Sequence, residues 1–290
     1  MLNLLIKIIF KTAALIPNGM AVILGRSLGF FLRVIGFRRK GLREHIAIAG
    51  ESFLDEDPVA FEKKVYRHFG LLVVEFLRLA YMKNDKFNAL FEVHGLENLD
   101  EALSAGSGVM SVSGHLGNWE YSVAHLAQKG YDIRLVVKDM KGVDNDYLYG
   151  LLRGRKGVKW IYKRKSVMEI FRAFKDNASV GFVVDQKCGE KEGVLVKFFD
   201  KPAYAYSGLY VLGKKKKAKI LPVYSWRDED LLRHHVKILP AIDFIETGNA
   251  DDDIRVNTQA YVSVIEEAIK EHPEQWIWMH NRWKNTKHLF

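Results

Sequence analysis

His115 and Glu120 stand out because an imidazole and a nearby carboxylate can act as a base and its orienting partner. Both lie in the stretch GHLGNWE, which directly follows the apolar run GVMSVS. Five residues correspond to about 140° around a helix axis, so the two side chains would diverge on one regular helix. They can meet if His115 lies in a loop and a helix begins after it.

Asn118 gives a helix a reason to begin there. Asparagine is a favoured N-cap, and Glu120 would then stand in the first helical turn, where the helix dipole stabilises a carboxylate. In that arrangement Glu120 holds one imidazole nitrogen of His115, and the other nitrogen can take a proton from a hydroxyl. A histidine with a purely structural role fits the same spacing.

Other chemistries find less support in the residues. No G-x-S-x-G elbow accompanies Ser111 or Ser113, which disfavours a serine hydrolase. The sequence has no H-E-x-x-H segment and a single cysteine, Cys188, so we expect no catalytic metal. Direct attack by a substrate hydroxyl, deprotonated by His115, is the most economical mechanism, and it requires no organic cofactor.

Helices and strands must position these residues, and the sequence predicts most of them from residue 91 onward. There, β-branched runs alternate with helical stretches. The alternation predicts an α/β fold, a layered αβα sandwich around a mixed, largely parallel sheet. In such sheets, sites gather where the strands end. We expect strands at 108–114, 132–138, 158–163, 179–185, 194–199, 219–225 and 234–240, and helices at 58–81, 118–129, 144–154, 166–177, 204–217 and 256–271.

The N-terminal segment, residues 1–40, differs from the main domain at 41–290 in being both apolar and basic. Residues 1–50 contain eight lysines and arginines and one acidic residue, Glu44, so they carry most of the chain's net charge of +9. Such a charge favours an anionic partner. A nucleic acid fits the charge alone, but the apolar residues between the charges favour a membrane surface.

The apolar character of this segment is interrupted. Its longest charge-free run lies between Lys11 and Arg26 and contains Pro17, whereas a spanning helix needs about 20 apolar residues. We therefore expect two amphipathic helices, at about 2–15 and 20–36, that lie in the bilayer interface. Core helices of the domain are the alternative.

Four motifs, in order, resemble those of the lipid A biosynthesis lauroyl/myristoyl acyltransferases, a family of the lysophospholipid acyltransferase superfamily. The glycerolipid branch of that superfamily usually has Asp where this chain has Glu120. The resemblance extends from about residue 20 to 285. The motifs are H-x4-E in GHLGNWE, Val184-Asp185-Gln186, GVLVKFFDKP at 193–202 and PEQWIWMHNRWK at 273–284.

This resemblance implies an acyl chain donated as a thioester of acyl carrier protein, or of coenzyme A, to a hydroxyl of a membrane glycolipid. The acceptor would be a lipid A precursor, and the enzyme would act at the cytoplasmic face of the bacterial inner membrane as a peripheral or monotopic protein. His115 would be the general base, Glu120 its partner and Arg153 a candidate to stabilise the oxyanion. The implied substrate-binding residues are Arg153, Asp185, Asn118 and, if the register is shifted, Arg155.

Some residues depart from the family pattern. Asp200 replaces the usual Gly after Phe-Phe, and Tyr204 and Tyr206 stand where small hydroxyl residues are common. These departures affect the assignment of the acceptor lipid more than the assignment of the chemical mechanism. An acyltransferase for a glycerolipid or a mannosylated lipid therefore stays open, as does a non-catalytic lipid-binding protein. The run Lys214–Lys217 could dock an acidic carrier protein or form a solvated face.

Overall fold

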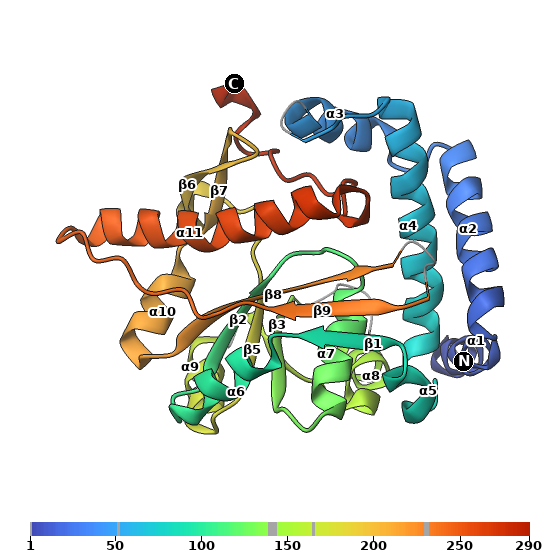
Figure 1. The fold of residues 1–290 in the computed structure, drawn as a ribbon, viewed down its shortest axis with the longest axis horizontal. Coiled ribbons are helices and arrows are strands. Elements are labelled where there is room, and N and C mark those ends of the chain that lie inside the picture. Colours follow the sequence, from blue (N-terminus) through green and yellow to red (C-terminus); the bar gives the residue numbers. More distant parts are fainter. Residues whose placement is uncertain (1, 51–52, 139–143, 164–165, 229–231) are drawn as a thin grey trace.

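The computed structural model describes residues 2–50, 53–138, 144–163, 166–228 and 232–290. Its centre is a seven-stranded sheet with the strand order β1-β9-β8-β2-β5-β3-β4 (Figure 1). The five adjacent strands from β8 to β4 run parallel. Strand β9 pairs antiparallel with β8, and β1 pairs parallel with β9. The sheet is thus mixed and largely parallel, as predicted. The strands are β1 Phe91–His94, β2 Val109–Ser113, β3 Ile133–Val137, β4 Lys159–Tyr162, β5 Ser179–Val183, β8 Lys219–Arg227 and β9 His234–Ile238.

Helices cover both faces of this sheet, which explains why its central strands are apolar on both sides. In β2, Met110 and Val112 join one hydrophobic cluster, and Val109 joins a second one on the opposite face. Helices α9 (Ser166–Lys175) and α11 (Ala250–Glu271) contribute to the first cluster. Helices α6 (Leu96–Ser104) and α7 (Trp119–Gln128) contribute to the second. The layered αβα prediction is confirmed.

The predicted element at 204–217 is wrong at its beginning. Residues Lys201–Tyr206 form strand β7, which pairs with β6 (Gly193–Phe198) in a separate hairpin, and helix α10 spans Gly208–Lys216. Ala203 and Ala205 are buried, whereas Pro202, Tyr204 and Tyr206 are half-buried, which is the two-residue period of a strand. The sequence indicated a helix because the apolar residues of β7 are followed closely by the apolar start of α10.

The turn of this hairpin explains the departure at Asp200. Phe199 and Asp200 have positive φ angles of 51° and 57°, as the two central residues of a type I′ turn require. Aspartate tolerates this left-handed conformation better than most residues do. Asp200 can therefore take the place of a turn glycine.

The N-terminal helices pack against the long helix α4 (Pro58–Leu79) at one end of the sheet (Figure 1). They are α1 (Leu2–Leu15) and α2 (Asn18–Val34), close to the predicted bounds. A Cβ atom on Gly70 of α4 would lie 2.2 Å from the Gly25 carbonyl oxygen and 2.4 Å from the Gly29 amide nitrogen. Glycine at these three positions lets the two helices touch backbone to backbone.

Away from α4, the first two helices expose many large apolar side chains. No single helix in the described residues has both the length and the hydropathy of a bilayer-spanning segment. Asn3–Leu15 and Asn18–Val34 reach that length and hydropathy only as a pair, and this pair is bent by 120°. The exposed residues on this apolar surface are Leu4, Leu5, Ile8, Ile9, Leu15, Met20, Ile23, Leu24, Phe30, Phe31 and Val34.

Helices at 39–49, 84–88 and 96–104 were not predicted from the sequence, whereas the helix at 145–152 agrees with the one predicted at 144–154. The remaining helices of the described residues are α3 Arg39–Ala49, α5 Asn84–Asn88 and α8 Asn145–Leu152, with short 3-10 turns at Gly154–Lys156, Glu190–Glu192, Pro273–Gln275 and Lys287–Leu289.

Candidate active site

The loop between β2 and α7 carries the GHLGNWE motif at the carboxyl edge of the parallel strands. Asn118 caps α7, because its side-chain oxygen accepts a hydrogen bond from the Tyr121 amide at 3.0 Å. Glu120 stands in the first turn, as predicted. Gly117 has a φ of +60°, and a Cβ atom there would lie 2.3 Å from the Ser225 carbonyl oxygen. The second glycine of the motif thus lets the loop pass close to β8.

The partner of the His115 ring is Asp185, which follows β5. Strands β2 and β5 are parallel neighbours, so the residues after them meet at one edge of the sheet. His115 Nδ1 lies 2.8 Å from Asp185 Oδ1, and the His115 backbone amide donates to Oδ2 at 2.7 Å. The Trp276 indole also donates to Oδ2, at 2.7 Å. One buried carboxylate therefore fixes both the backbone and the ring of His115.

The surroundings of Asp185 keep its carboxylate ionised. Burial would raise the pKa of Asp185, but the charge of His115 and the hydrogen bonds from His115 and Trp276 outweigh it and lower the pKa to about 2. An ionised Asp185 accepts the Nδ1 proton of the imidazole, whether the ring is charged or neutral. It therefore selects the His115 tautomer whose Nε2 atom carries a lone pair.

The Nε2 atom of His115 is the side of the ring available for chemistry. The side-chain amide nitrogen of Gln186 lies 2.9 Å from it and can donate a hydrogen bond to that lone pair. The His115 side chain is 15% exposed, so the ring is shielded but accessible. An incoming hydroxyl that displaces Gln186 would find an oriented base.

Glu120 is not the partner of His115, contrary to our expectation from the spacing. It forms a two-pronged ion pair with Arg153, with Nε to Oε2 at 2.9 Å and Nη2 to Oε1 at 2.5 Å. Both side chains are largely buried. Burial lowers the pKa of Arg153, but the charge of Glu120 and its hydrogen bonds more than compensate and raise it. The first turn of α7 directs Glu120 toward the end of α8, whereas β5 brings Asp185 to His115.

Arg153 retains a free donor beside this ion pair. Its Nη1 atom is buried and has no hydrogen-bond partner in the part of the chain that the structure describes. By contrast, Arg155 donates from Nε to the Ala80 carbonyl oxygen at 3.0 Å and lies over the Tyr81 ring at 4.2 Å. Of the two arginines considered for the site, Arg153 is the one that contacts Glu120.

Asn118 is also tied to a buried ionic network behind the motif. Its amide donates to Glu75 Oε2 at 2.8 Å, and Glu75 in turn pairs with Arg227 and lies 3.3 Å from His234. Burial raises the pKa of Glu75, but Arg227 and His234 lower it more, to well below its usual range. Sequence reasoning missed Glu75, although a glutamate inside the apolar helical stretch LLVVEFLRL is the signal of a buried ion pair.

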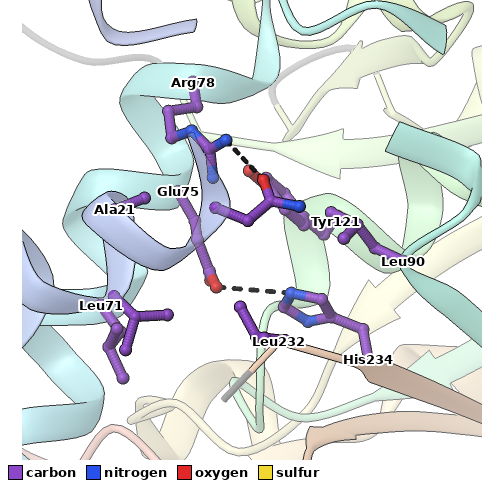
Figure 2. A pocket seen from close by; sticks show the side chains of 10 residues that line it. Ala21, Leu71, Glu75, Arg78, Leu90, Tyr121, Leu232 and His234 are labelled. Atoms are coloured by element: carbon purple, nitrogen blue, oxygen red, sulfur yellow. Dashed lines mark hydrogen bonds and ion pairs between the residues drawn. The ribbon is translucent and has the colours of Figure 1, made fainter. Parts of the chain in front are cut away.

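A small cavity lies beside this network (Figure 2). Its volume of about 20 Å³ is enough for one water molecule. Figure 2 shows Glu75 directed toward His234, whose ring centre lies 5.1 Å from that of Tyr121. The Tyr121 hydroxyl is buried without a hydrogen-bond partner among the described residues, so a water molecule here would satisfy it.

A larger, mainly apolar groove of about 570 Å³ lies between α3 and the start of α4. This size is typical of small-molecule sites. The groove is distinct from the His115 loop, since its lining includes none of the residues discussed above. Its lining residues are Arg43, Ile46, Ala47, Gly50, Leu54, Glu56, Pro58, Val59 and Glu62.

An imidazole held by a buried carboxylate is the arrangement by which many enzymes activate a hydroxyl. Comparison with known protein families shows which class of enzyme this is. The chain matches the bacterial lipid A biosynthesis acyltransferase family over residues 1–285 and belongs to it. It is therefore an acyltransferase, and the family resemblance seen in the four motifs is confirmed.

Individual relatives agree with this family. The chain is 26% identical to a lipid A biosynthesis palmitoleoyltransferase of Escherichia coli (strain K12) over 275 residues, which cover 93% of this chain and 86% of the relative. A lauroyltransferase of the same organism is 22% identical over 264 residues, covering 90% and 84%. A phosphatidylinositol mannoside acyltransferase of Mycobacterium tuberculosis (strain CDC 1551 / Oshkosh) is 24% identical over 216 residues, covering 72% and 66%.

Proposed function

We propose that this acyltransferase moves a fatty acyl group from an acyl carrier protein thioester, or acyl-coenzyme A, to a hydroxyl of a membrane glycolipid. The acceptor is a lipid A precursor, and His115 is the general base. The observation that carries this proposal is the contact of His115 Nδ1 with the buried Asp185 carboxylate at 2.8 Å, which leaves Nε2 to accept a proton.

The reaction begins when the acceptor hydroxyl replaces Gln186 at His115 Nε2. The imidazole takes the hydroxyl proton while the oxygen attacks the thioester carbonyl, and Asp185 stabilises the resulting imidazolium. The free Nη1 donor of Arg153 stabilises the oxyanion of the tetrahedral intermediate. When the carbon–sulfur bond breaks, the imidazolium returns its proton to the leaving thiolate. Glu120 acts in this scheme by orienting the Arg153 guanidinium.

The donor carries its acyl chain on an acidic carrier protein in this proposal. The run Lys214–Lys217 at the end of α10 offers several cations for such a partner. Of these, Lys215 and Lys216 lie over the Phe171 ring, at 5.9 and 4.4 Å from its centre. The basic patch therefore has a defined position on the main domain.

The enzyme binds to the cytoplasmic face of the bacterial inner membrane as a peripheral or monotopic protein in this scheme. Two features support the assignment: the apolar surface of α1 and α2, and the basic residues of the same segment. Such a location would place a lipid acceptor within reach of a carrier-bound donor. The bent arrangement of the two helices suits an interfacial position.

A mannosylated lipid is the second candidate acceptor, because one of the relatives is a phosphatidylinositol mannoside acyltransferase. Its headgroup would offer a sugar hydroxyl to the same base. Tyr204 and Tyr206, where the chain also departs from the family pattern, fit a change of acceptor as well. Both candidates use the same mechanism and differ only in the lipid.

A panel of acceptors tests the proposal with the purified full-length enzyme in detergent micelles. We expect transfer from lauroyl-, myristoyl- or palmitoleoyl-carrier protein to a lipid A precursor, measured by mass spectrometry of the extracted lipids. Transfer to phosphatidylinositol mannoside alone would favour the second candidate. Transfer only to a lysoglycerophospholipid would reject both glycolipid assignments. Parallel reactions with acyl-coenzyme A identify the donor.

A further inference from the structure

A second group of histidines lies on the main sheet and shares no residue with the His115 site. Strands β1 and β9 run parallel, with Glu92 opposite His235 in their register. His94 lies two residues beyond Glu92, so its side chain points to the same face of the sheet. One ligand atom from each of these three residues lies within 4.8 Å of the other two.

The distances between these atoms approach those of a metal coordination sphere. His94 Nε2 lies 3.0 Å from His235 Nδ1, and Glu92 Oε1 lies 3.7 Å from His94 Nε2. Zinc–nitrogen bonds of about 2.0–2.1 Å at a tetrahedral angle place two ligand nitrogens about 3.4 Å apart. Moving the two histidine nitrogens apart by about 0.4 Å, together with a rotation of the Glu92 side chain, would therefore seat an ion between the three groups.

Asp228 orients His235 in the way that a metal ligand requires. The Asp228 Oδ1 atom lies 2.8 Å from His235 Nε2, so it accepts the proton on that nitrogen and leaves Nδ1 with its lone pair toward His94. Ligating histidines usually donate their second ring N–H to a carboxylate, which fixes the tautomer and raises ligand basicity. The cluster thus has an outer carboxylate as well as three inner ligands.

Stacked rings hold His235 in this orientation. Its ring lies parallel to Trp226 at 4.8 Å between centres, and Trp226 lies parallel to His272 at 4.9 Å on the same sheet face. The His235 side chain is only 11% exposed, whereas Glu92 and His94 are nearly half exposed. A buried His235 and two more exposed ligands, Glu92 and His94, would leave a path for an ion and a position for water.

We propose that Glu92, His94 and His235 form a binding site for a divalent transition-metal ion of the zinc class. Two neutral imidazoles and one carboxylate suit such an ion better than magnesium or calcium, which prefer oxygen ligands. Arg233 lies 3.5 Å from the second oxygen of Glu92, which leaves Oε1 for the metal. The ion would clip the edge strand β1 to β9. The site stands independently of the proposed acyl transfer.

Zinc binding to the tag-free, full-length protein in detergent tests this site. After chelator treatment, we expect one equivalent of Zn²⁺ to bind in competition with a chromogenic chelator and to raise the melting temperature. His94→Gln and His235→Gln should abolish both effects, and Asp228→Asn should weaken binding by about 10- to 100-fold. His272→Gln is the matched control, because His272 stacks on Trp226 but offers no ligand.

Two results would overturn the proposal. The first is zinc binding of equal affinity in wild type, His94→Gln and His235→Gln, and the second is equal loss in His272→Gln. A titration of the wild-type protein with Co²⁺ needs no variant and covers the case in which a substitution prevents folding. Four-coordinate ligand-field bands that Zn²⁺ removes support the site, and their absence shows that the histidines form only a hydrogen-bonded pair.

Discussion

The orientation of His115 depends on a single buried carboxylate, that of Asp185. An amide in its place would keep the shape but could not favour the Nδ1–H tautomer or stabilise the imidazolium. We predict that Asp185→Asn lowers kcat for acyl transfer by about 10²- to 10⁴-fold with little change in KM. Steady-state kinetics with an acyl carrier protein thioester measures this effect. Asp200→Asn, on the hairpin turn, is the control and should retain activity.

Asp185 also makes the stability of the fold depend on pH. Its pKa of about 2 in the folded protein lies below the usual value of about 3.9. Its contribution is therefore complete above pH 5 and is lost as pH falls through these two values. We expect the wild type to lose about 1 kcal/mol of its stability advantage over Asp185→Asn between pH 6 and pH 3. Denaturant unfolding of both proteins measures it, and a constant difference would contradict this assignment.

The residue types of the site were predictable, but their pairing was not. The Asn118 cap and the first-turn position of Glu120 follow from local sequence, because N-cap chemistry acts over three or four residues. The contact of His115 with Asp185 joins residues 70 positions apart and depends on β5 lying beside β2. Only the strand order fixes this neighbourhood, and spacing within one motif cannot reveal it.

At the scale of elements, the contact between α2 and α4 rests on glycine. We predict that Gly70→Ala lowers the free energy of unfolding by about 1–3 kcal/mol or more, because its methyl group would overlap the backbone of Gly25 and Gly29. Gly41→Ala, in α3, meets no atom within 4 Å and should be neutral or slightly stabilising. Thermal unfolding compares the two. Equal melting temperatures would show that α2 does not pack as described.

Elements with a clear period were predicted well, and elements without one were not. The apolar strands of the main sheet and the long helix α4 agree with prediction to within one or two residues at most ends. The end of strand β7 was mistaken for the start of a helix, although Ser207 and Gly208 separate its last residue, Tyr206, from the apolar part of α10. Strand β1 has only four residues, too few to show alternation.

The whole molecule presents an apolar surface on α1 and α2 that suits a membrane interface. We predict that replacing Phe30 and Phe31 by serine reduces binding to vesicles with anionic lipid at least about 10-fold, because each inserted phenylalanine contributes about 1.5–3 kcal/mol. Vesicle flotation measures the bound fraction. The control pair Val167→Ser and Met168→Ser alters exposed apolar residues of α9 and should not change it.

Flotation at rising salt separates the two contributions to this binding. If the basic residues add to the apolar contact, binding should weaken with ionic strength but not vanish. Equal flotation of the Phe30/Phe31 variant and the wild type would reject α1 and α2 as the membrane-binding surface.

The most direct test of the account is acyl transfer by a His115→Ala variant. The purified enzyme, an acyl carrier protein thioester and a lipid A precursor are mixed in detergent micelles, and ester formation is followed by mass spectrometry. We predict that His115→Ala loses at least about 10³-fold in rate while its circular dichroism spectrum is unchanged, and that His288→Ala, at an exposed position, retains activity. A folded His115→Ala enzyme with undiminished transfer would contradict the assignment of His115 as the general base.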